Sequence, residues 1–206
     1  SMHSFLSRRT QPYVYSDYSI FLAEVASTFN EKLLARHFLH TLHGKHEKIF
    51  LIHQILEDIR GTLFRQTMFA EFEMYLHRFV EQAVPLTPSF LKEQYLALNQ
   101  SYFGDAVVLD EYTAIEWARI PHFYYNFYVF QYATGISAAL SLEEFVATGQ
   151  PGAQDAYLSF LKDGCRHYPI ETMRLAGIDM TSPSPVLQTL TIFRSLLAEL
   201  EQLLAV

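Results

Sequence analysis

The sequence predicts an all-α fold. Apolar residues recur at intervals of three and four along most of the 206 residues, which is the spacing of one helical face. Cap residues and Pro or Gly breakers separate these stretches from one another. A single short piece, 106–109, is predicted to be extended, so helices are expected to account for nearly all of the regular structure.

Local chemistry marks the ends of each predicted helix in turn. Ser16 and Asp17 supply N-cap oxygens for the first helix, which Gly44 ends. Gly61 predicts a kink in the second helix, and Pro88 takes the first position of the third. Later helices end at glycines or open at Ser-Pro pairs. The predicted ranges, in order, are about 16–42, 46–83, 88–103, 121–140 with a further turn over 141–148, 153–162, 169–176 and 184–204.

Composition restricts the classes of function. Half of the residues are apolar (50%) and no repeat or linker divides the chain, so we expect one domain over 1–206. The net charge of −7 offers no basic surface to nucleic acid or to an anionic membrane, and neither is expected as a partner. No apolar run reaches the roughly 18 residues of a membrane span. The one cysteine, Cys165, cannot form an internal disulfide, which favours a cytoplasmic location.

Three carboxylates are spaced by seven in the first predicted helix: Asp17, Glu24 and Glu31. Because a helix drifts only about 20° over seven residues, they are expected to form one line on a mostly apolar helix. A carboxylate in such surroundings needs a partner. One interpretation is ion pairing with a cation such as Arg65 or Arg119, which composition alone favours. The other is a hard oxygen ligand for a metal cation.

A second candidate group lies in the segment IPHFYYNFYVFQYATG. His122 follows a proline, and Tyr124, Tyr125, Tyr128 and Tyr132 are spaced so that one helix would present them on one face. Phenol and imidazole groups can donate hydrogen bonds to a developing oxyanion. Packing is the commoner role for any single tyrosine, but packing alone explains a cluster with a histidine less readily.

Four long segments carry a family resemblance: QPYVYSDYSIFLAEVASTFNEKLL, RGTLFRQTMFAEFE, WARIPHFYYNFYVFQYATG and YPIETMRLAGIDMTSPSPV. Together, in this order, they resemble the C-terminal part of oligoendopeptidase F, a zinc metallopeptidase related to thimet oligopeptidase. In that family two histidines of an HExxH helix and a glutamate from a later helix hold the zinc ion. The segment of that glutamate matches FLAEVAST, so the resemblance implies that Glu24 is the third zinc ligand.

The resemblance also implies a fold, a reaction and further roles. The chain would be the multi-helix C-terminal part of a helical, bowl-shaped metallopeptidase that admits short peptides as substrates. Tyr125 and Tyr128 would be the favoured donors to the oxyanion or to the substrate backbone, and Tyr124 and His122 would be the alternates. The residues implied are His122, Tyr124, Tyr125 and Tyr128 at the substrate, and Asp17 and Glu31 as groups that orient the metal ligands.

The sequence departs from the family pattern at HExxH, which does not occur in the 206 residues. In the family a segment similar to SMHSF follows HExxH directly, so we expect a fragment that begins just after the second histidine ligand, through truncation or a split gene. Alone, it would lack two ligands and the general base, bind zinc weakly and be inactive. Its partner would be the missing N-terminal part, and its uncovered acidic face would favour a homodimer. The alternative is a non-catalytic helical interaction module or a degenerate paralogue, which explains the missing motif directly.

Overall fold

The structure is a computed structural model that describes residues 2–205. It contains helices and turns and, within this range, no strand, so the predicted all-α fold is confirmed. Two compact units divide the chain, the first comprising 2–63 and 134–205 and the second comprising 64–133. The single domain expected over 1–206 stays a prediction.

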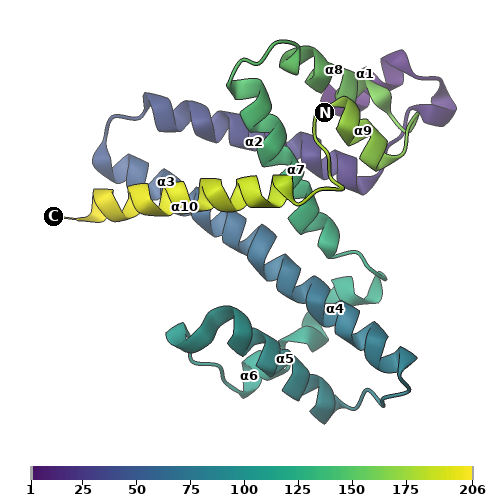
Figure 1. Cartoon of the computed structure of the whole chain (residues 1–206), viewed down its shortest axis with the longest axis vertical. Coiled ribbons are helices and arrows are strands. Elements are labelled where there is room, and N and C mark those ends of the chain that lie inside the picture. The colour runs from purple at the N-terminus through teal and green to yellow at the C-terminus, as the bar shows by residue number, and fades with distance from the viewer. Residues whose placement is uncertain (1, 206) are drawn as a thin grey trace. The chain divides into compact units, whose positions relative to one another are not determined.

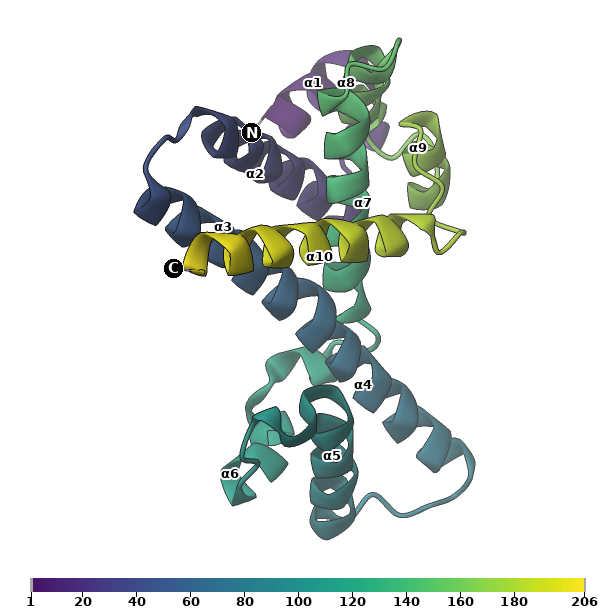
Figure 2. The ribbon, with the colours of Figure 1, turned by 60° about the vertical axis from the view of Figure 1, so that its left-hand side comes forward.

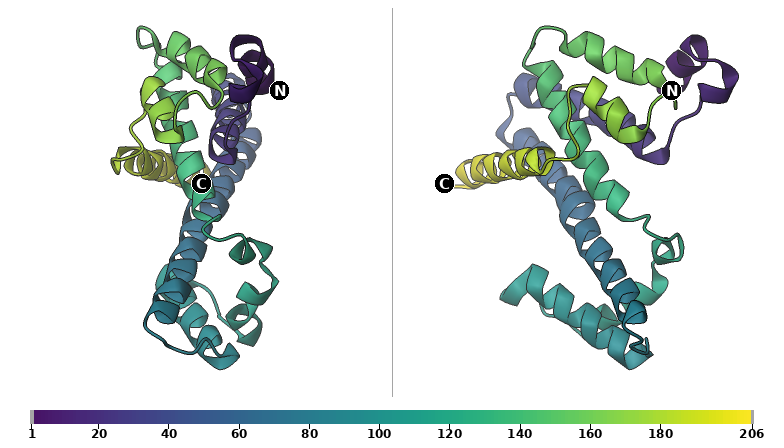
Figure 3. Two further views of the ribbon diagram at one scale, coloured as in Figure 1. Left: turned by 90° about the vertical axis from the view of Figure 1, so that its right-hand side faces the viewer. Right: turned by 45° about the vertical axis from the view of Figure 1, so that its right-hand side comes forward.

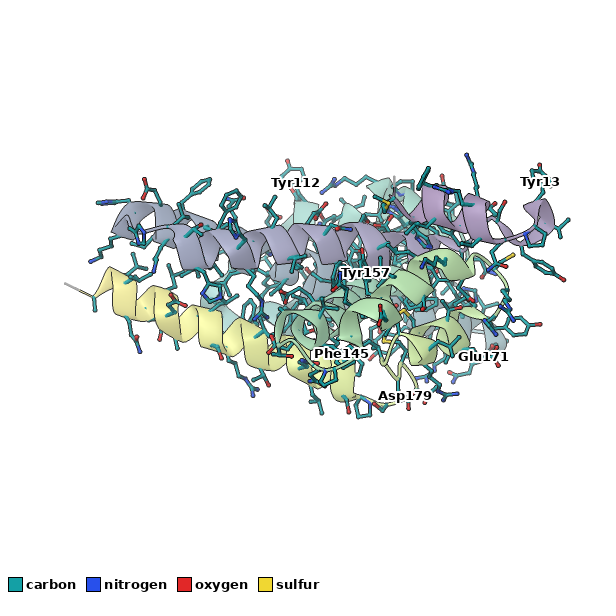
Figure 4. The ribbon with its side chains drawn as sticks, turned by 90° about the horizontal axis from the view of Figure 1, so that it is seen from above. Tyr13, Tyr112, Phe145, Tyr157, Glu171 and Asp179 are labelled. Atoms are coloured by element: carbon teal, nitrogen blue, oxygen red, sulfur yellow. The ribbon has the colours of Figure 1, made fainter. Side chains whose placement is uncertain are left out.

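The first unit consists of helices joined by turns: α1 (Met2–Thr10), α2 (Ile20–Thr41), α3 (Lys45–Ile59), the greater part of α7 (Phe130–Ala147), α8 (Ala153–Asp163), α9 (Pro169–Leu175) and α10 (Ser184–Leu204). Its core includes Phe29, Leu142 and Phe160, from three of these helices. α1 lies against α8, and α10 runs beside α3 (Figure 1), a pairing that Figure 2 shows from another side. Tyr157 of α8, labelled in Figure 4, stacks on Phe29 with ring centroids 4.0 Å apart.

The second unit is smaller and has its own aromatic core. It contains α4 (Arg65–Glu81), α5 (Pro88–Phe103), α6 (Glu111–Ala114) and 3-10 turns at Gly104–Ala106, Glu116–Arg119 and Pro121–Tyr124. α5 packs against both α4 and α6 (Figure 3). Phe72 and Tyr95 are fully buried where α4 meets α5, with ring centroids 5.0 Å apart in an edge-on contact.

Most helix ends lie where local chemistry predicted them. Thr87 is the N-cap of α5 and its hydroxyl accepts the N–H of Phe90, while Gly164 ends α8 with a φ of +60°. The kink expected at Gly61 is a π-helical turn, Arg60–Phe64, between α3 and α4. Of the helices described, none combines the length and the apolar character needed to cross a bilayer.

The first predicted helix begins later than expected. α2 starts at Ile20, and its N-cap is Ser19. The segment before it is held instead by α1, because the Ser7 hydroxyl donates to the carbonyl of Ser16 at 2.6 Å. Asp17 therefore lies outside the helix, and the predicted line of three carboxylates is wrong at its first member.

The helix predicted from Pro121 begins instead at Phe130. Asn126 and Phe127 have φ values of +47° and +54°, which a right-handed helix cannot contain. The chain before this turn forms the short 3-10 element Pro121–Tyr124. The prediction that one helical face carries all four tyrosines is therefore wrong.

Candidate functional site

Glu24 lies in the second turn of α2 and is half-buried. Within residues 2–205, its carboxylate has neither a hydrogen-bond donor nor an ion-pair partner; the Ser27 hydroxyl contacts only its backbone oxygen, at 3.1 Å. α7 approaches its stem closely, because a Cβ built on Gly135 would lie 3.7 Å from the Cβ of Glu24. The side chain is thus held at its base while its oxygens remain open to a ligand.

The two arginines considered as ion-pair partners bind another carboxylate. Arg65 and Arg119 lie 2.5 and 2.6 Å from Oε1 of Glu116, and the Tyr95 hydroxyl donates to Oε2 at 2.9 Å. Burial raises the pKa of Glu116, but the hydrogen bonds from Arg65 and Tyr95 outweigh burial and hold that pKa below its usual value. These arginines therefore anchor the turn that carries Glu116.

The structure separates the two acidic residues expected to support Glu24. Asp17 is exposed on the loop before α2, where its Oδ1 accepts the N–H of Tyr18 at 2.9 Å. Glu31 is exposed on α2, seven residues after Glu24, and so shares its face. Among residues 2–205 there is no group of three His, Cys, Asp or Glu side chains that could hold a metal ion together. Their role in orienting metal ligands stays a prediction.

His122 is surrounded by tyrosine rings within the second unit. The ring of Tyr128 stacks on it with centroids 5.6 Å apart, Tyr132 meets it edge-on at 5.5 Å, and Tyr125 does so at 6.3 Å. The Tyr132 hydroxyl lies 3.0 Å from Nε2 of His122. We call these four residues the His122 cluster. It gathers hydroxyl and imidazole groups at one place although the helix expected to align them is absent.

The candidate tyrosines differ in their relation to this cluster. Tyr125 and Tyr128 both belong to it, with ring centroids 5.9 Å apart. Tyr124 is 76% exposed and, within the described part of the chain, makes no ring contact with the other three tyrosines or with His122. The sequence predicts Tyr132 on the same helical face as the other three tyrosines but assigns it no role. Its contacts with His122 add it to the candidate site residues.

Glu73 is a residue that sequence reasoning missed. It lies on α4, is 3% exposed, and its Oε1 accepts the N–H of Phe127 at 2.7 Å. One signal was available in the sequence, since Glu73 is a carboxylate between the apolar residues Phe72 and Met74. Its partner could not be found in the same way, because the two residues are 54 positions apart.

Comparison with known proteins places the chain in a family. Residues 1–192 match the sequence profile of Peptidase family M3. The chain belongs to this family. A Peptidase family M3 relative, the oligopeptidase PepF of Bacillus subtilis (strain 168), is 49% identical over 205 residues, which are 99% of this chain and 30% of PepF.

Two crystal structures of Peptidase family M3 proteins resemble this chain closely. A putative peptidase from Chlamydophila abortus has a TM-score of 0.92 and 44% identity, covering 99% of this chain and 34% of its own. Oligoendopeptidase-F from Enterococcus faecium has a TM-score of 0.87 and 42% identity, and the match covers 98% of this chain and 38% of the E. faecium chain. The chain thus spans about a third of the length of these relatives. The resemblance to oligoendopeptidase F is confirmed, while the roles of individual residues stay predictions.

Proposed function

We propose that the chain carries part of the active site of a zinc-dependent endopeptidase that cleaves short peptides. The observation that carries this proposal is the match of residues 1–192 to a peptidase family, with relatives named oligopeptidase and oligoendopeptidase-F. Short peptides as substrates, and the cytoplasm as the location favoured by the single cysteine, belong to the same proposal.

Glu24 is the residue that would hold the metal. Its carboxylate is a hard oxygen donor, half-buried and unpartnered among the described residues, which suits a divalent cation. A catalytic zinc site takes three protein ligands, so Glu24 would contribute one, and an HExxH segment, absent from the 206 residues, would contribute two. When bound, zinc polarises the scissile carbonyl and lowers the pKa of a water to about 7.

The His122 cluster would serve the peptide. Tyr125 and Tyr128 present hydroxyl donors beside the imidazole of His122, and donors of this kind stabilise negative charge as it develops on a carbonyl oxygen. Tyr132 would orient the imidazole through its contact with Nε2. Exposed Tyr124 would contact the substrate away from the reacting carbonyl.

One observation favours a different function. HExxH does not occur in the 206 residues, and a helical interaction module or a degenerate paralogue would need no such motif. The unpartnered Glu24 counts against this alternative, because a scaffold gains nothing from a half-buried carboxylate without a partner.

A chimera tests the proposal. The chain replaces the matching segment of B. subtilis PepF, and the chimera is assayed with a quenched fluorescent peptide for zinc-dependent cleavage. Glu24→Gln keeps the shape but gives a neutral amide, so zinc content and cleavage should be lost together. Glu47→Gln, at an exposed acid on α3, is the matched control and should retain both. Parental zinc content and activity in Glu24→Gln would contradict the assignment.

A further inference from the structure

The turn at Asn126 and Phe127 has an unusual backbone. Both residues have positive φ, +47° and +54°, and neither is a glycine. Asparagine tolerates this region, but a residue as bulky as phenylalanine adopts it only when its surroundings impose it. The turn lies between His122 and Tyr125 on one side and Tyr128 and Tyr132 on the other, so its conformation determines whether their rings meet.

Two side chains of α4 hold this turn. Glu73 accepts the N–H of Phe127 at 2.7 Å. His77 stacks on the ring of Phe127, with centroids 4.2 Å apart and planes 27° from parallel. The two are four residues apart and therefore lie on the same face of α4. Phe127 is thus fixed at its backbone by Glu73 and at its side chain by His77.

Glu73 is almost fully buried, so its carboxylate needs a hydrogen-bond partner. At 3% exposure, a carboxylate is costly unless hydrogen bonds compensate it. A charged acceptor forms a hydrogen bond roughly twice as strong as a neutral one, which suits a backbone that must be kept in a strained conformation. An apolar residue would fill the same space in the core but would leave the Phe127 N–H without an acceptor.

We propose that Glu73 is a positioning residue for the His122 cluster. Its carboxylate locks the Asn126–Phe127 turn and so sets the places of Tyr125 and Tyr128 around His122. The inference rests on the proposed function for its catalytic meaning. The lock itself is a property of the second unit alone.

Hydrogen–deuterium exchange of the 206-residue chain tests the lock directly. In Glu73→Leu, amides of residues 125–128 should exchange at least about tenfold faster than in the parent, because the turn loses its acceptor. In Glu73→Gln, which keeps an acceptor without charge, exchange should rise by about threefold. The control is Glu71→Leu on the same helix, where the carboxylate accepts the hydroxyls of Tyr75 and Tyr102 and does not touch the turn. It should leave exchange in the turn unchanged.

Several exchange results would overturn the lock. One is parental exchange of the turn in both Glu73 variants, and another is an equal rise in Glu71→Leu. If circular dichroism finds Glu73→Leu unfolded, Glu73→Gln decides alone, and parental exchange there overturns the proposal.

Kinetics of the PepF chimera test the positioning role. Because a misplaced donor affects mainly the transition state, Glu73→Leu should lower kcat by about 10²-fold with KM within about twofold. Zinc content should stay parental, and Glu73→Gln should recover most of the rate. A faster-exchanging turn with parental kcat would overturn the positioning role. No cleavage by the parental chimera would count against the proposed function instead, and exchange alone would then decide whether Glu73 locks the turn.

Discussion

His3 should make the stability of the chain depend on pH in the mildly acidic range. Its imidazole is 4% exposed, neither ring nitrogen has a partner among the described residues, and the ring stacks on Tyr18 with centroids 3.7 Å apart. Burial lowers the pKa of His3 from 6.5 to about 4. Between pH 6.5 and about 4, His3 is therefore protonated in the unfolded chain but not in the folded chain. The free energy of unfolding falls as the pH drops through this range.

The size of this loss follows from the width of the pH window. Between 6.5 and a working pH of about 5 there are about 1.5 pH units, and at about 1.36 kcal/mol per unit the loss is about 2 kcal/mol. For a chain of this length that corresponds to a melting temperature lower by about 4 to 8 °C.

His3→Phe removes the titrating group and keeps an aromatic ring on Tyr18. Urea denaturation, followed by circular dichroism at about pH 7.5 and about pH 5, should find that acid destabilises the parent by about 2 kcal/mol more than the variant. Equal losses in the two proteins would refute the assignment of the effect to His3.

Three further predictions concern the site and its supports. In the PepF chimera, Tyr128→Phe should lower kcat by about 10²–10³-fold at parental zinc content, and normal kcat would reduce Tyr128 to a packing role. The 206-residue chain alone should self-associate, because Leu34 and Phe38 of α2 are 54% and 43% exposed, and a purely monomeric profile in light scattering would contradict this. It should also bind no zinc tightly, because Glu24 alone cannot replace three protein ligands, and tight binding in a zinc titration would contradict that. Gly164→Ala should reduce the free energy of unfolding by about 2 kcal/mol or more, since its Cβ would lie 2.0 Å from the backbone oxygen of Tyr15, and an unchanged urea midpoint would contradict this.

Local chemistry was enough to predict most of the fold. The ends of α5 and α8 follow from Thr87 and Gly164, whose cap roles depend on neighbours within a few residues. Where prediction failed, a distant contact decides the conformation. The Ser7 hydroxyl of α1 hydrogen-bonds the Ser16 carbonyl in the segment before α2. The Glu73 carboxylate accepts the N–H of Phe127 in the turn that interrupts the helix expected from Pro121.

The candidate site divides in a similar way. The role of Glu24 came from a family resemblance and not from spacing, because the residues that would complete a metal site are not among the 206. The His122 cluster was expected from helical spacing, yet a turn assembles it. Tyr125 and Tyr128 meet His122 because the chain bends at Asn126 and Phe127 between them, and no periodicity in the sequence predicts that bend.

The left-handed backbone at Phe127 bears on any attempt to improve this protein by laboratory evolution. Glycine adopts a φ of +54° without steric conflict, so Phe127→Gly would relieve the backbone strain of the turn. The same change would delete the ring that His77 stacks on and leave one side of the turn unsupported. Relief of backbone strain and support of the turn therefore favour different residues at position 127, so in the peptidase proposed above a variant chosen for an unstrained backbone should turn over more slowly.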